Sequence, residues 1–550
     1  MNFLKIFRDS FVDNWDKPAV TSYATGLTLS YGVLGARIER VRHLLEKLHV
    51  PAGAHIAVVG GNSIDWITNY MAVMLHGAVA VTAQVTYEAA DMLDMLASAD
   101  TEILFIDQEL MPGFPDWSSV PSLGLVISQD TQMVLVSRSE AYADAQRVLD
   151  NVDQEFVNIY PNGMEPGDVS AADLRPDSPA AIFFTAGTLG PSRPVLLSCD
   201  NMEGNVIYGM KALLFPRGSR TLTSSSVGNV WGTIFNVVVP LASGAHITVF
   251  GDFYNPEALI EAFRRVKPRR VIMSPRQLRD VYSVVKRRYE RSVFYRLARL
   301  VPFSRTLVDA GMRNAFDRAT GRHCVEVVIG STNADRRLKA RLHRVGIRYT
   351  VSYGLTECGG LVCYTPENDF NPATVGHPIR NIVKCRLRPI EIPGLPDEAG
   401  VLEIRGMTVM KEYYNDHEST RESFTQDGWF STGDLATINR DGEVSIIGRL
   451  DTIIPRQGGT IVPERLEARL LSMPGVRQAL VVDRDGVTTA VIVPDDSIGE
   501  DDDARRQAVD RMIDSVNGMI PSFARIDDVE IYRDMLDVTL KGTIARYKYL

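Results

Sequence analysis

Much of the chain alternates short apolar runs with amphipathic stretches. One run covers residues 54–60, and Ser63 after it can cap a helix that begins at residue 64. Similar runs, typical of buried strands, lie at residues 77–82, 102–107, 124–128, 246–250, 270–273 and 325–330. A long basic helical region is expected over residues 276–322. This strand–helix–strand alternation predicts parallel β-sheets covered by helices.

After Pro389 the apolar runs become shorter and turn residues separate them. Asp-Gly pairs at residues 427–428 and 441–442 stand between apolar runs, which is a pattern typical of β-hairpins. We therefore expect a small β-rich subdomain in this part of the chain.

The last part of the chain has the pattern of a separate α+β unit. Paired strands are expected at residues 478–483 and 489–493, and an amphipathic helix over residues 504–517. The predicted fold class is α/β. Residues 1–448 would form a large N-terminal domain of helix-covered β-sheets that includes the β-rich subdomain, and residues 449–550 a small C-terminal α+β domain.

The length of 550 residues exceeds what one hydrophobic core supports, because single cores stop growing at roughly 250–300 residues. The composition, 45% hydrophobic and 23% charged, is that of a soluble globular protein. A net charge of −9 argues against a general nucleic-acid-binding protein, which usually carries a basic surplus. The most apolar long window, residues 233–250, is interrupted by Asn236, Pro240 and His246, so no transmembrane segment is expected.

Five scattered cysteines form no CxxC pair. Cys358 and Cys363 come nearest to one, and we expect them to be small buried residues rather than metal ligands. The N-terminus lacks a long apolar region and reaches Asp9 early, unlike a signal peptide. These features favour a reduced, cytoplasmic location.

Residues 181–193 combine several groups that can bind an anion. An apolar strand is followed by the loop Thr185-Ala186-Gly187-Thr188-Leu189-Gly190 and then by Arg193. Glycines let backbone N–H groups approach an anion, hydroxyls donate further hydrogen bonds, and an arginine neutralises charge. The segment can therefore cradle phosphates, although it is neither a P-loop nor a GxGxxG motif. A plain surface turn explains the residues equally well.

A second segment contains Tyr353, Gly354, Thr356 and Glu357. The aromatic ring can stack on a base, the hydroxyl can reach a phosphate, and the carboxylate can hold Mg²⁺. A capped helix start is the alternative.

A third segment places Asp434 after Thr432-Gly433, and Gly448-Arg449-Leu450-Asp451 follows. An acid at this kind of turn can accept hydrogen bonds from ribose hydroxyls. As a lone element, a turn with an exposed aspartate is the more ordinary explanation.

Taken in order, these segments resemble the acyl-adenylate-forming superfamily, which comprises acyl- and aryl-CoA synthetases, peptide-synthetase adenylation domains and firefly-type luciferases. The resemblance runs from about Lys17 to the C-terminus and is closest to the long-chain fatty acyl-CoA synthetases. The Tyr-Gly-x-Thr-Glu box of that family matches residues 353–357 without a change, and the Thr-Gly-Asp box matches residues 432–434. Its Gly-Arg-x-(Asp/Lys) hinge matches residues 448–451, and its phosphate loop matches residues 185–194 in part.

The resemblance implies an ATP-dependent acid–thiol ligase that uses Mg²⁺ and CoA. A carboxylic acid, expected to be a fatty acid, would attack the α-phosphate of ATP to give an acyl-adenylate and pyrophosphate. A mobile C-terminal domain would then rotate, and a thiol would take the acyl group.

The resemblance also implies roles for individual residues. The phosphates would be held by Thr185, Ala186, Gly187, Thr188 and Gly190, with Arg193 as a catalytic cation. Adenine would lie against Gly330, Ser331, Thr332, Tyr353 and Gly354, and the ribose against Asp434 and Arg449. Thr356 would reach the α-phosphate, Glu357 would hold Mg²⁺, Asp451 would be the hinge, and Gly458 and Gly459 would line the thiol tunnel.

Three departures from the family pattern affect these implied roles. The phosphate loop closes with Ser192-Arg193-Pro194 in place of Pro-Lys-Gly, and an arginine fork is not equivalent to an ammonium. Residues 223–231 lack the usual aromatic-His pair, and Trp231 either fills part of the acyl pocket or is a core residue. The C-terminal Gly-Lys pair is replaced by Lys541-Gly542-Thr543, so Lys541 is the expected catalytic lysine and Lys548 the alternative.

Three functions remain open at this stage. The first is transfer of the acyl group to CoA, and the second is transfer to the phosphopantetheine arm of an acyl carrier protein. The third is a non-catalytic relative that binds nucleotide or acyl ligand. A basic stretch between residues 264 and 291 could dock an acidic carrier or, as a peripheral membrane contact, anionic lipid headgroups. A solvated helix face is the simpler explanation of that stretch.

Overall fold

The computed structural model describes residues 3–114, 116–185, 192–251, 254–300, 304–330, 336–366, 369–495, 498, 501–537 and 544–550. The largest sheet has eight strands in the order β17-β9-β8-β4-β3-β5-β6-β7, and all of them except β17 come from the first part of the chain. Its centre is parallel, as predicted, and both edges are antiparallel. The strands are β3 (His55–Val59), β4 (Val79–Ala83), β5 (Ile103–Ile106), β6 (Leu125–Ser128), β7 (Val134–Ser137), β8 (Pro179–Phe184), β9 (Pro194–Ser198) and β17 (Glu412–Tyr413).

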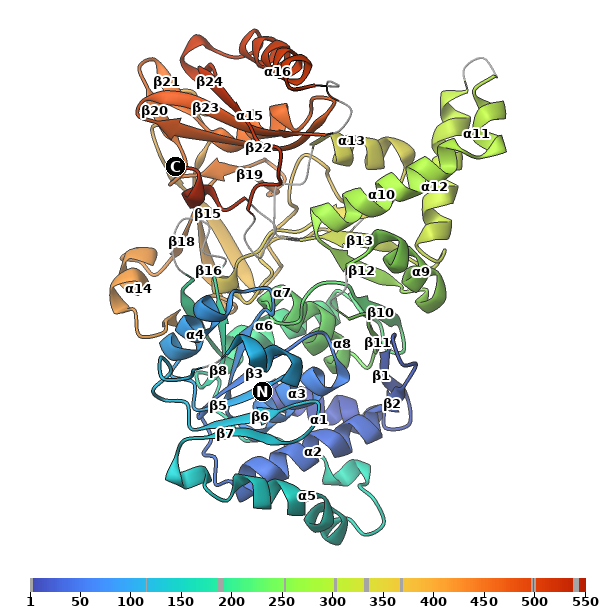
Figure 1. The fold of residues 1–550 in the computed structure, drawn as a ribbon, viewed down its shortest axis with the longest axis vertical. Coiled ribbons are helices and arrows are strands. Elements are labelled where there is room, and N and C mark those ends of the chain that lie inside the picture. The colour runs from blue at the N-terminus through green and yellow to red at the C-terminus, as the bar shows by residue number, and fades with distance from the viewer. Residues whose placement is uncertain are drawn as a thin grey trace.

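Helices cover this sheet because their apolar faces need a partner surface. Ser63 caps α3 (Ile64–His76) as expected, since its hydroxyl accepts the backbone N–H of Trp66 at 2.9 Å. The other helices of this region are α1 (Phe3–Asp13), α2 (Tyr31–Lys47), α4 (Ala89–Ser98), α5 (Ala145–Ile159), α6 (Cys199–Lys211) and the 3₁₀ turns η1 (Gln108–Gly113), η2 (Glu140–Tyr142) and η3 (Pro166–Asp168). Figure 1 shows α2 and α5 at one end of the molecule.

Two smaller sheets continue the N-terminal domain. A four-stranded sheet has the order β10-β11-β1-β2, and an all-parallel sheet has the order β12-β13-β14. The strands are β1 (Pro18–Ser22), β2 (Thr28–Ser30), β10 (Arg220–Thr223), β11 (His246–Val249), β12 (Arg270–Met273), β13 (Glu326–Ile329) and β14 (Tyr349–Val351). Between β10 and β12 the chain forms α7 (Val230–Thr233), the π-helix η4 (Ile234–Val238), α8 (Val239–Ala242) and α9 (Pro256–Val266).

In its described residues, 276–300 and 304–322, the basic region expected to be helical forms three separate helices, α10 (Pro275–Glu290), α11 (Val293–Ala298) and α12 (Arg305–Ala319). The break after α10 has a local cause, because the Ser292 hydroxyl accepts the backbone N–H of Tyr295 at 3.2 Å and so starts α11. Helix α13 (Arg336–Val345) follows β13 and leads into β14.

The predicted β-rich subdomain is an antiparallel sheet with the order β15-β16-β18-β19. The Asp441-Gly442 pair turns between its last two strands, and Gly442 has the positive φ of 86° that such turns favour. Its elements are β15 (Val383–Pro389), β16 (Gly400–Gly406), α14 (His417–Ser423), β18 (Phe430–Ile438) and β19 (Val444–Arg449), preceded by the 3₁₀ turn η5 (Thr356–Cys358).

The C-terminal domain has its own sheet, β22-β23-β24, and its own apolar core. Strands β22 and β23 are antiparallel partners, which confirms the predicted pair. The elements are β20 (Ile454–Arg456), β21 (Gly459–Ile461), α15 (Pro463–Leu470), β22 (Val476–Arg484), β23 (Val487–Pro494), α16 (Asp502–Asn517), η6 (Ser522–Ala524), β24 (Asp528–Ile531) and η7 (Arg546–Lys548).

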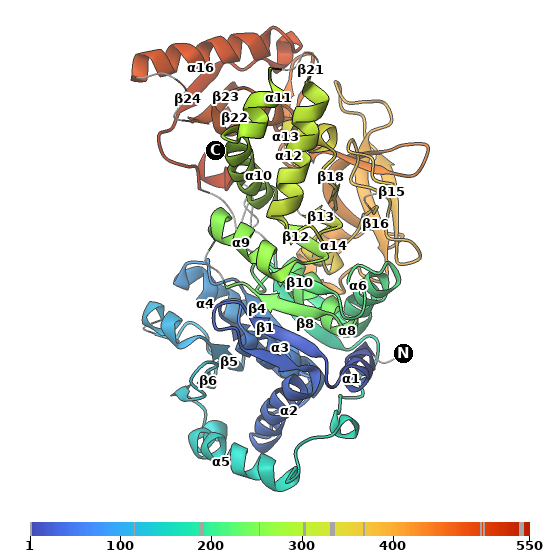
Figure 2. The same ribbon diagram turned by 90° about the vertical axis from the view of Figure 1, so that its right-hand side faces the viewer.

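The C-terminal domain lies at the end of the molecule opposite α2 and α5, and Figure 2 shows the same arrangement from the side. The β-rich subdomain and β12–β14 lie between these two ends, and the helices α10–α12 extend from there so that α11 lies level with the C-terminal domain. Among the described residues, no helix is both long and apolar enough to cross a bilayer.

Candidate active site

The segment after β14 begins the site, and its shape depends on one glycine. Tyr353 forms an isolated β-bridge with Cys363, and the chain then turns at Gly354. A Cβ at Gly354 would lie 1.4 Å from the carbonyl oxygen of Gly360, so only glycine permits this close approach. The turn leads directly into η5, where Thr356 is buried.

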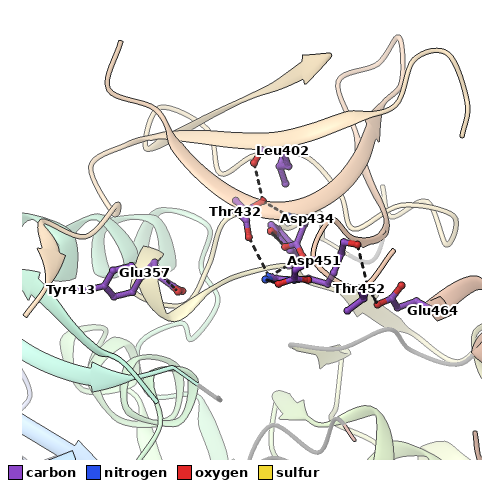
Figure 3. Close-up of polar contacts among 10 residues, drawn as sticks. Glu357, Leu402, Tyr413, Thr432, Asp434, Asp451, Thr452 and Glu464 are labelled. Carbon is purple, nitrogen blue, oxygen red and sulfur yellow. Dashed lines mark hydrogen bonds and ion pairs between the residues drawn. The ribbon is translucent and has the colours of Figure 1, made fainter. Parts of the chain in front are cut away.

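Tyr353 and Asp434 join the Tyr-Gly-x-Thr-Glu segment to the β-rich subdomain. The Tyr353 hydroxyl donates to Asp434 Oδ2 at 2.5 Å. The Asp434 backbone N–H donates to the Thr432 hydroxyl at 3.0 Å, and that hydroxyl donates to the Leu402 carbonyl at 2.8 Å (Figure 3). Gly433 between them has a φ of 72°, a conformation that favours glycine.

Electrostatics at Asp434 follow from its burial. Only 6% of the residue is exposed, and burial raises the pKa of its carboxyl, although the Arg449 guanidinium opposes that rise. Burial also raises the pKa of the Tyr353 hydroxyl, and the neighbouring Asp434 charge raises it further. The tyrosine therefore stays a hydrogen-bond donor.

Arg449 faces Asp434 across β18 and β19, because the two residues are register partners. Its Nη1 lies 3.4 Å from Asp434 Oδ1. Its Nε and Nη2 donate to Asp451 at 3.2 and 2.7 Å, which is a bidentate contact. One guanidinium therefore links the predicted ribose acid to the predicted hinge residue.

Glu357 belongs to a second group of side chains. The Tyr413 hydroxyl donates to Glu357 Oε1 at 2.9 Å, and the Arg193 guanidinium lies over the Tyr413 ring at 5.4 Å. Arg193 and Thr185 are bound to each other twice, through the Thr185 hydroxyl at 2.9 Å and the Thr185 backbone N–H at 3.0 Å. Pairing of β9 with both β8 and β17 thus places the edge of the predicted phosphate loop beside Tyr413, the hydrogen-bond partner of the predicted metal ligand.

Figure 3 shows Glu357 and Tyr413 lying apart from Thr432, Asp434 and Asp451. The two groups are nevertheless joined through the short segment from Tyr353 to Glu357. Tyr413 was not predicted from the sequence. Its contact with Glu357 spans 56 residues, and no spacing rule reports such a distance.

Gly330 follows β13, and the indole of Trp231 lies against it, 3.6 Å from where a Cβ would be. Trp231 is 9% exposed and packs against Phe235 with the ring centroids 4.9 Å apart and the ring planes tilted by 38°. Its indole N–H has no hydrogen-bond partner among the described residues. Trp231 also lines a cavity of about 10 Å³, which has room for about one water molecule. The cavity walls are Leu214, Phe215, Trp231, Phe235, Arg270, Ile272, Val328, Leu361 and Tyr364.

A buried polar network forms one side of this cavity. Glu326 is fully buried and accepts hydrogen bonds from Arg270 Nε at 2.6 Å and from the Tyr364 hydroxyl at 2.8 Å, as well as from the Thr350 hydroxyl. The sequence carried a signal for this network that was not used, since Glu326 stands within an otherwise apolar strand and a buried acid needs partners.

The other predicted site residues fall into two sets. Gly458 and Gly459 lie in the C-terminal domain, where the Phe523 side chain packs against both. Lys548 pairs with Asp537 at 3.0 Å in the same domain. Ala186, Gly187, Thr188, Gly190, Ser331, Thr332 and Lys541 lie outside the described residues.

The ligands available at Glu357 fit Mg²⁺ better than a metal whose ligands must all come from the protein. No group of three His, Cys, Asp or Glu side chains within the described ranges could hold a metal ion. Mg²⁺ typically uses one or two carboxylates together with substrate phosphates. Glu357 supplies one carboxylate, and its partner Tyr413 lies under the Arg193 cation. The arrangement can therefore bind a phosphorylated ligand at Glu357 and hydroxyl groups at Asp434.

Comparisons with known proteins show the family to which the chain belongs. Residues 7–414 match the AMP-binding enzyme family, and residues 451–550 match the AMP-binding enzyme C-terminal domain. The long-chain-fatty-acid–CoA ligase FadD15 of Mycobacterium bovis is 26% identical, over 80% of this chain and 72% of its own. The mitochondrial medium-chain acyl-CoA ligase ACSF2 of Homo sapiens is 22% identical, over 97% of this chain and 84% of its own.

Two solved structures share the fold. The ATP-bound MatB from Rhodopseudomonas palustris has a TM-score of 0.76 at 21% identity, covering 100% of this chain and 98% of its own. The anthranilate CoA ligase AuaEII, in complex with anthranoyl-AMP, has a TM-score of 0.79 at 18% identity, covering 100% of this chain and 96% of its own. These structures confirm the predicted α/β architecture with a large N-terminal and a small C-terminal domain.

Proposed function

The chain belongs to the AMP-binding enzyme family, and from that premise we propose that it activates a carboxylic acid with ATP and transfers the acyl group to CoA. The observation that carries the proposal is the link from Tyr353 through Asp434 and Arg449 to Asp451. This link connects the predicted adenine contact, ribose contact and hinge in one run of hydrogen bonds and ion pairs.

The described side chains suit the first half-reaction. Asp434 accepts hydrogen bonds from the ribose hydroxyls, and Tyr353 holds the carboxylate in place. Glu357 would hold Mg²⁺, which when bound offsets charge on the phosphates. Arg193 adds a fixed positive charge at the same place, where negative charge builds as the acid attacks the α-phosphate. Lys541 is proposed to approach that phosphate from the C-terminal domain.

The proposed acid is a fatty acid, and the similarity to FadD15, a long-chain-fatty-acid–CoA ligase, and to ACSF2, a medium-chain acyl-CoA ligase, supports that class. The acyl chain is proposed to enter beside Gly330, because the Trp231 indole lies against Gly330 and also lines the cavity, together with Val328. Trp231 would then limit how far the chain can reach.

Replacing Trp231 by Ala should shift acid preference toward longer chains. Removing the indole opens space next to Gly330 for a longer acyl chain. Each additional methylene bound in a hydrophobic pocket contributes about 1–3 kcal/mol. The ratio of kcat/KM for a longer acid over that for a shorter one should therefore rise about tenfold or more. Steady-state rates with a chain-length series measure this ratio. Trp429→Ala is the matched control, since Trp429 stacks under Arg386 away from the cavity. An unchanged ratio in the Trp231 variant would show that the acyl chain lies elsewhere.

The identity of the acyl acceptor is tested by detecting which thioester forms. Purified protein is given ATP, Mg²⁺ and the preferred acid, with either CoA or a phosphopantetheinylated carrier protein, and the acyl thioester is detected by mass spectrometry. Acyl-CoA is the expected product. A good carrier thioester without acyl-CoA would establish the carrier-protein function instead, and adenylate without either thioester would exclude both.

A further inference from the structure

Helix α11 occupies an exposed position. It connects α10 and α12, and Figure 1 shows it at the outer end of these helices, away from the eight-stranded sheet. One side of the helix is fixed, because the Tyr295 ring packs on Tyr289 with centroids 5.3 Å apart and Ala298 is buried. The opposite side faces solvent.

That solvent-facing side is apolar. Val293, Phe294, Leu297 and Leu300 are 68%, 52%, 59% and 78% exposed, at a spacing that puts them along one helical face. With Leu307, they make five of the 19 large hydrophobic side chains that are exposed in the described part of the chain. Single exposed hydrophobic residues are ordinary, but a cluster of this kind marks an interaction surface.

The charge around the cluster is strongly positive. Residues 287–307 contain six arginines and a single acid, Glu290, which pairs with Lys286 at 3.6 Å. All six arginine residues are exposed, although the chain as a whole carries a net charge of −9. The arginines are Arg287, Arg288, Arg291, Arg296, Arg299 and Arg305.

We propose that one surface, the α11 tip, docks this protein on a membrane that contains anionic lipids. The α11 tip consists of helix α11, the exposed Leu300 and Leu307, and the six arginines named above. Apolar side chains on a basic helix enter the boundary between headgroups and acyl chains, while arginines bind the headgroup phosphates. The tip projects from the molecule, so its apolar side chains can enter a bilayer without moving the body of the protein. The proposal rests on this surface alone and does not depend on the proposed reaction.

Vesicle binding tests the proposal directly. Full-length protein is sedimented with vesicles of phosphatidylcholine alone or of phosphatidylcholine with phosphatidylserine. We expect binding to the phosphatidylserine vesicles that weakens as ionic strength rises, and little binding to the neutral ones. The triple variant Phe294→Ser, Leu297→Ser, Leu300→Ser should bind at least about tenfold more weakly.

The matched control is Val157→Ser with Ile159→Ser, which removes two exposed hydrophobic residues from α5 at the opposite end of the molecule. It should bind vesicles like the wild type. A second variant, Arg296→Gln with Arg299→Gln, leaves the apolar face intact and should lower both the binding and its salt dependence. Thermal unfolding of each variant checks that it is folded.

Several results would overturn the proposal. The proposal is wrong if the wild-type protein does not sediment with phosphatidylserine vesicles. It is also wrong if the triple variant and the arginine variant are folded and bind these vesicles as strongly as the wild type. A dimer in lipid-free light scattering that the triple variant abolishes would assign the α11 tip to a second copy of the chain. Binding of an acidic carrier protein that needs the same side chains would assign it to that partner.

Discussion

Replacing Glu357 by Gln is expected to slow acid-dependent ATP–pyrophosphate exchange about 10³-fold, because one metal-holding carboxylate is worth several kcal/mol in phosphoryl chemistry. Gln keeps the size of the side chain and can still accept the Tyr413 hydroxyl, so the loss would come from charge rather than from packing. The Mg²⁺ concentration for half-maximal exchange should also rise. Both quantities come from exchange rates measured over a Mg²⁺ titration.

Tyr413→Phe is the matched control for Glu357. It removes the hydroxyl at 2.9 Å but keeps the ring that lies under Arg193. Since a hydrogen bond to a charged group contributes about 1.5–3 kcal/mol, its effect should be tenfold to about 10²-fold and smaller than that of Glu357→Gln. A Glu357→Gln enzyme that keeps the wild-type rate and Mg²⁺ dependence would remove Glu357 from the metal site.

Replacing Asp434 by Asn is expected to raise KM for ATP about 10²-fold, because two hydrogen bonds from ribose hydroxyls to a buried carboxylate are lost or weakened. The substitution is nearly isosteric, so the Arg449–Asp451 pair at 2.7 Å can remain. Steady-state kinetics with varied ATP measure KM, and the acid KM should change far less. Asp441→Asn, in the exposed turn between β18 and β19, is the control.

An Asp434→Asn enzyme with an unchanged KM for ATP would separate this acid from the nucleotide. Its role would then be confined to holding the Tyr353 hydroxyl and Arg449. A fall in kcat with KM unchanged would indicate misplacement of the neighbouring Tyr353–Glu357 segment.

Periodicity predicted the layers of the fold because buried strands and covering helices leave opposite hydrophobic patterns. The paired strands β22 and β23 were predicted correctly, as was the Ser63 cap. The subdivision of the basic helical region was not, because it depends on a capping hydroxyl at Ser292 that looks like any surface serine. The antiparallel edge formed by β17 follows from tertiary pairing with β9, and pairing across more than 200 residues leaves no local trace.

Motifs in the sequence predicted nucleotide-site and metal-site roles for Tyr353, Glu357, Asp434 and Arg449, and these roles stay predictions. The contacts that join these residues were beyond sequence reasoning, since Tyr413 reaches Glu357 and Tyr353 reaches Asp434 only in the folded chain. The hinge role of Asp451, the thiol tunnel at Gly458 and Gly459, and the catalytic role of Lys541 stay predictions.

The central claim is that this protein forms an acyl-adenylate, and acid-dependent ATP–pyrophosphate exchange tests it most directly. The purified protein is incubated with ATP, Mg²⁺, labelled pyrophosphate and a panel of carboxylic acids, beside the Lys541→Ala variant. We predict that at least one acid drives label into ATP in the wild type and that the variant loses this exchange. Absence of exchange with every acid, while the protein still binds ATP, would contradict the claim and establish a non-catalytic nucleotide-binding relative.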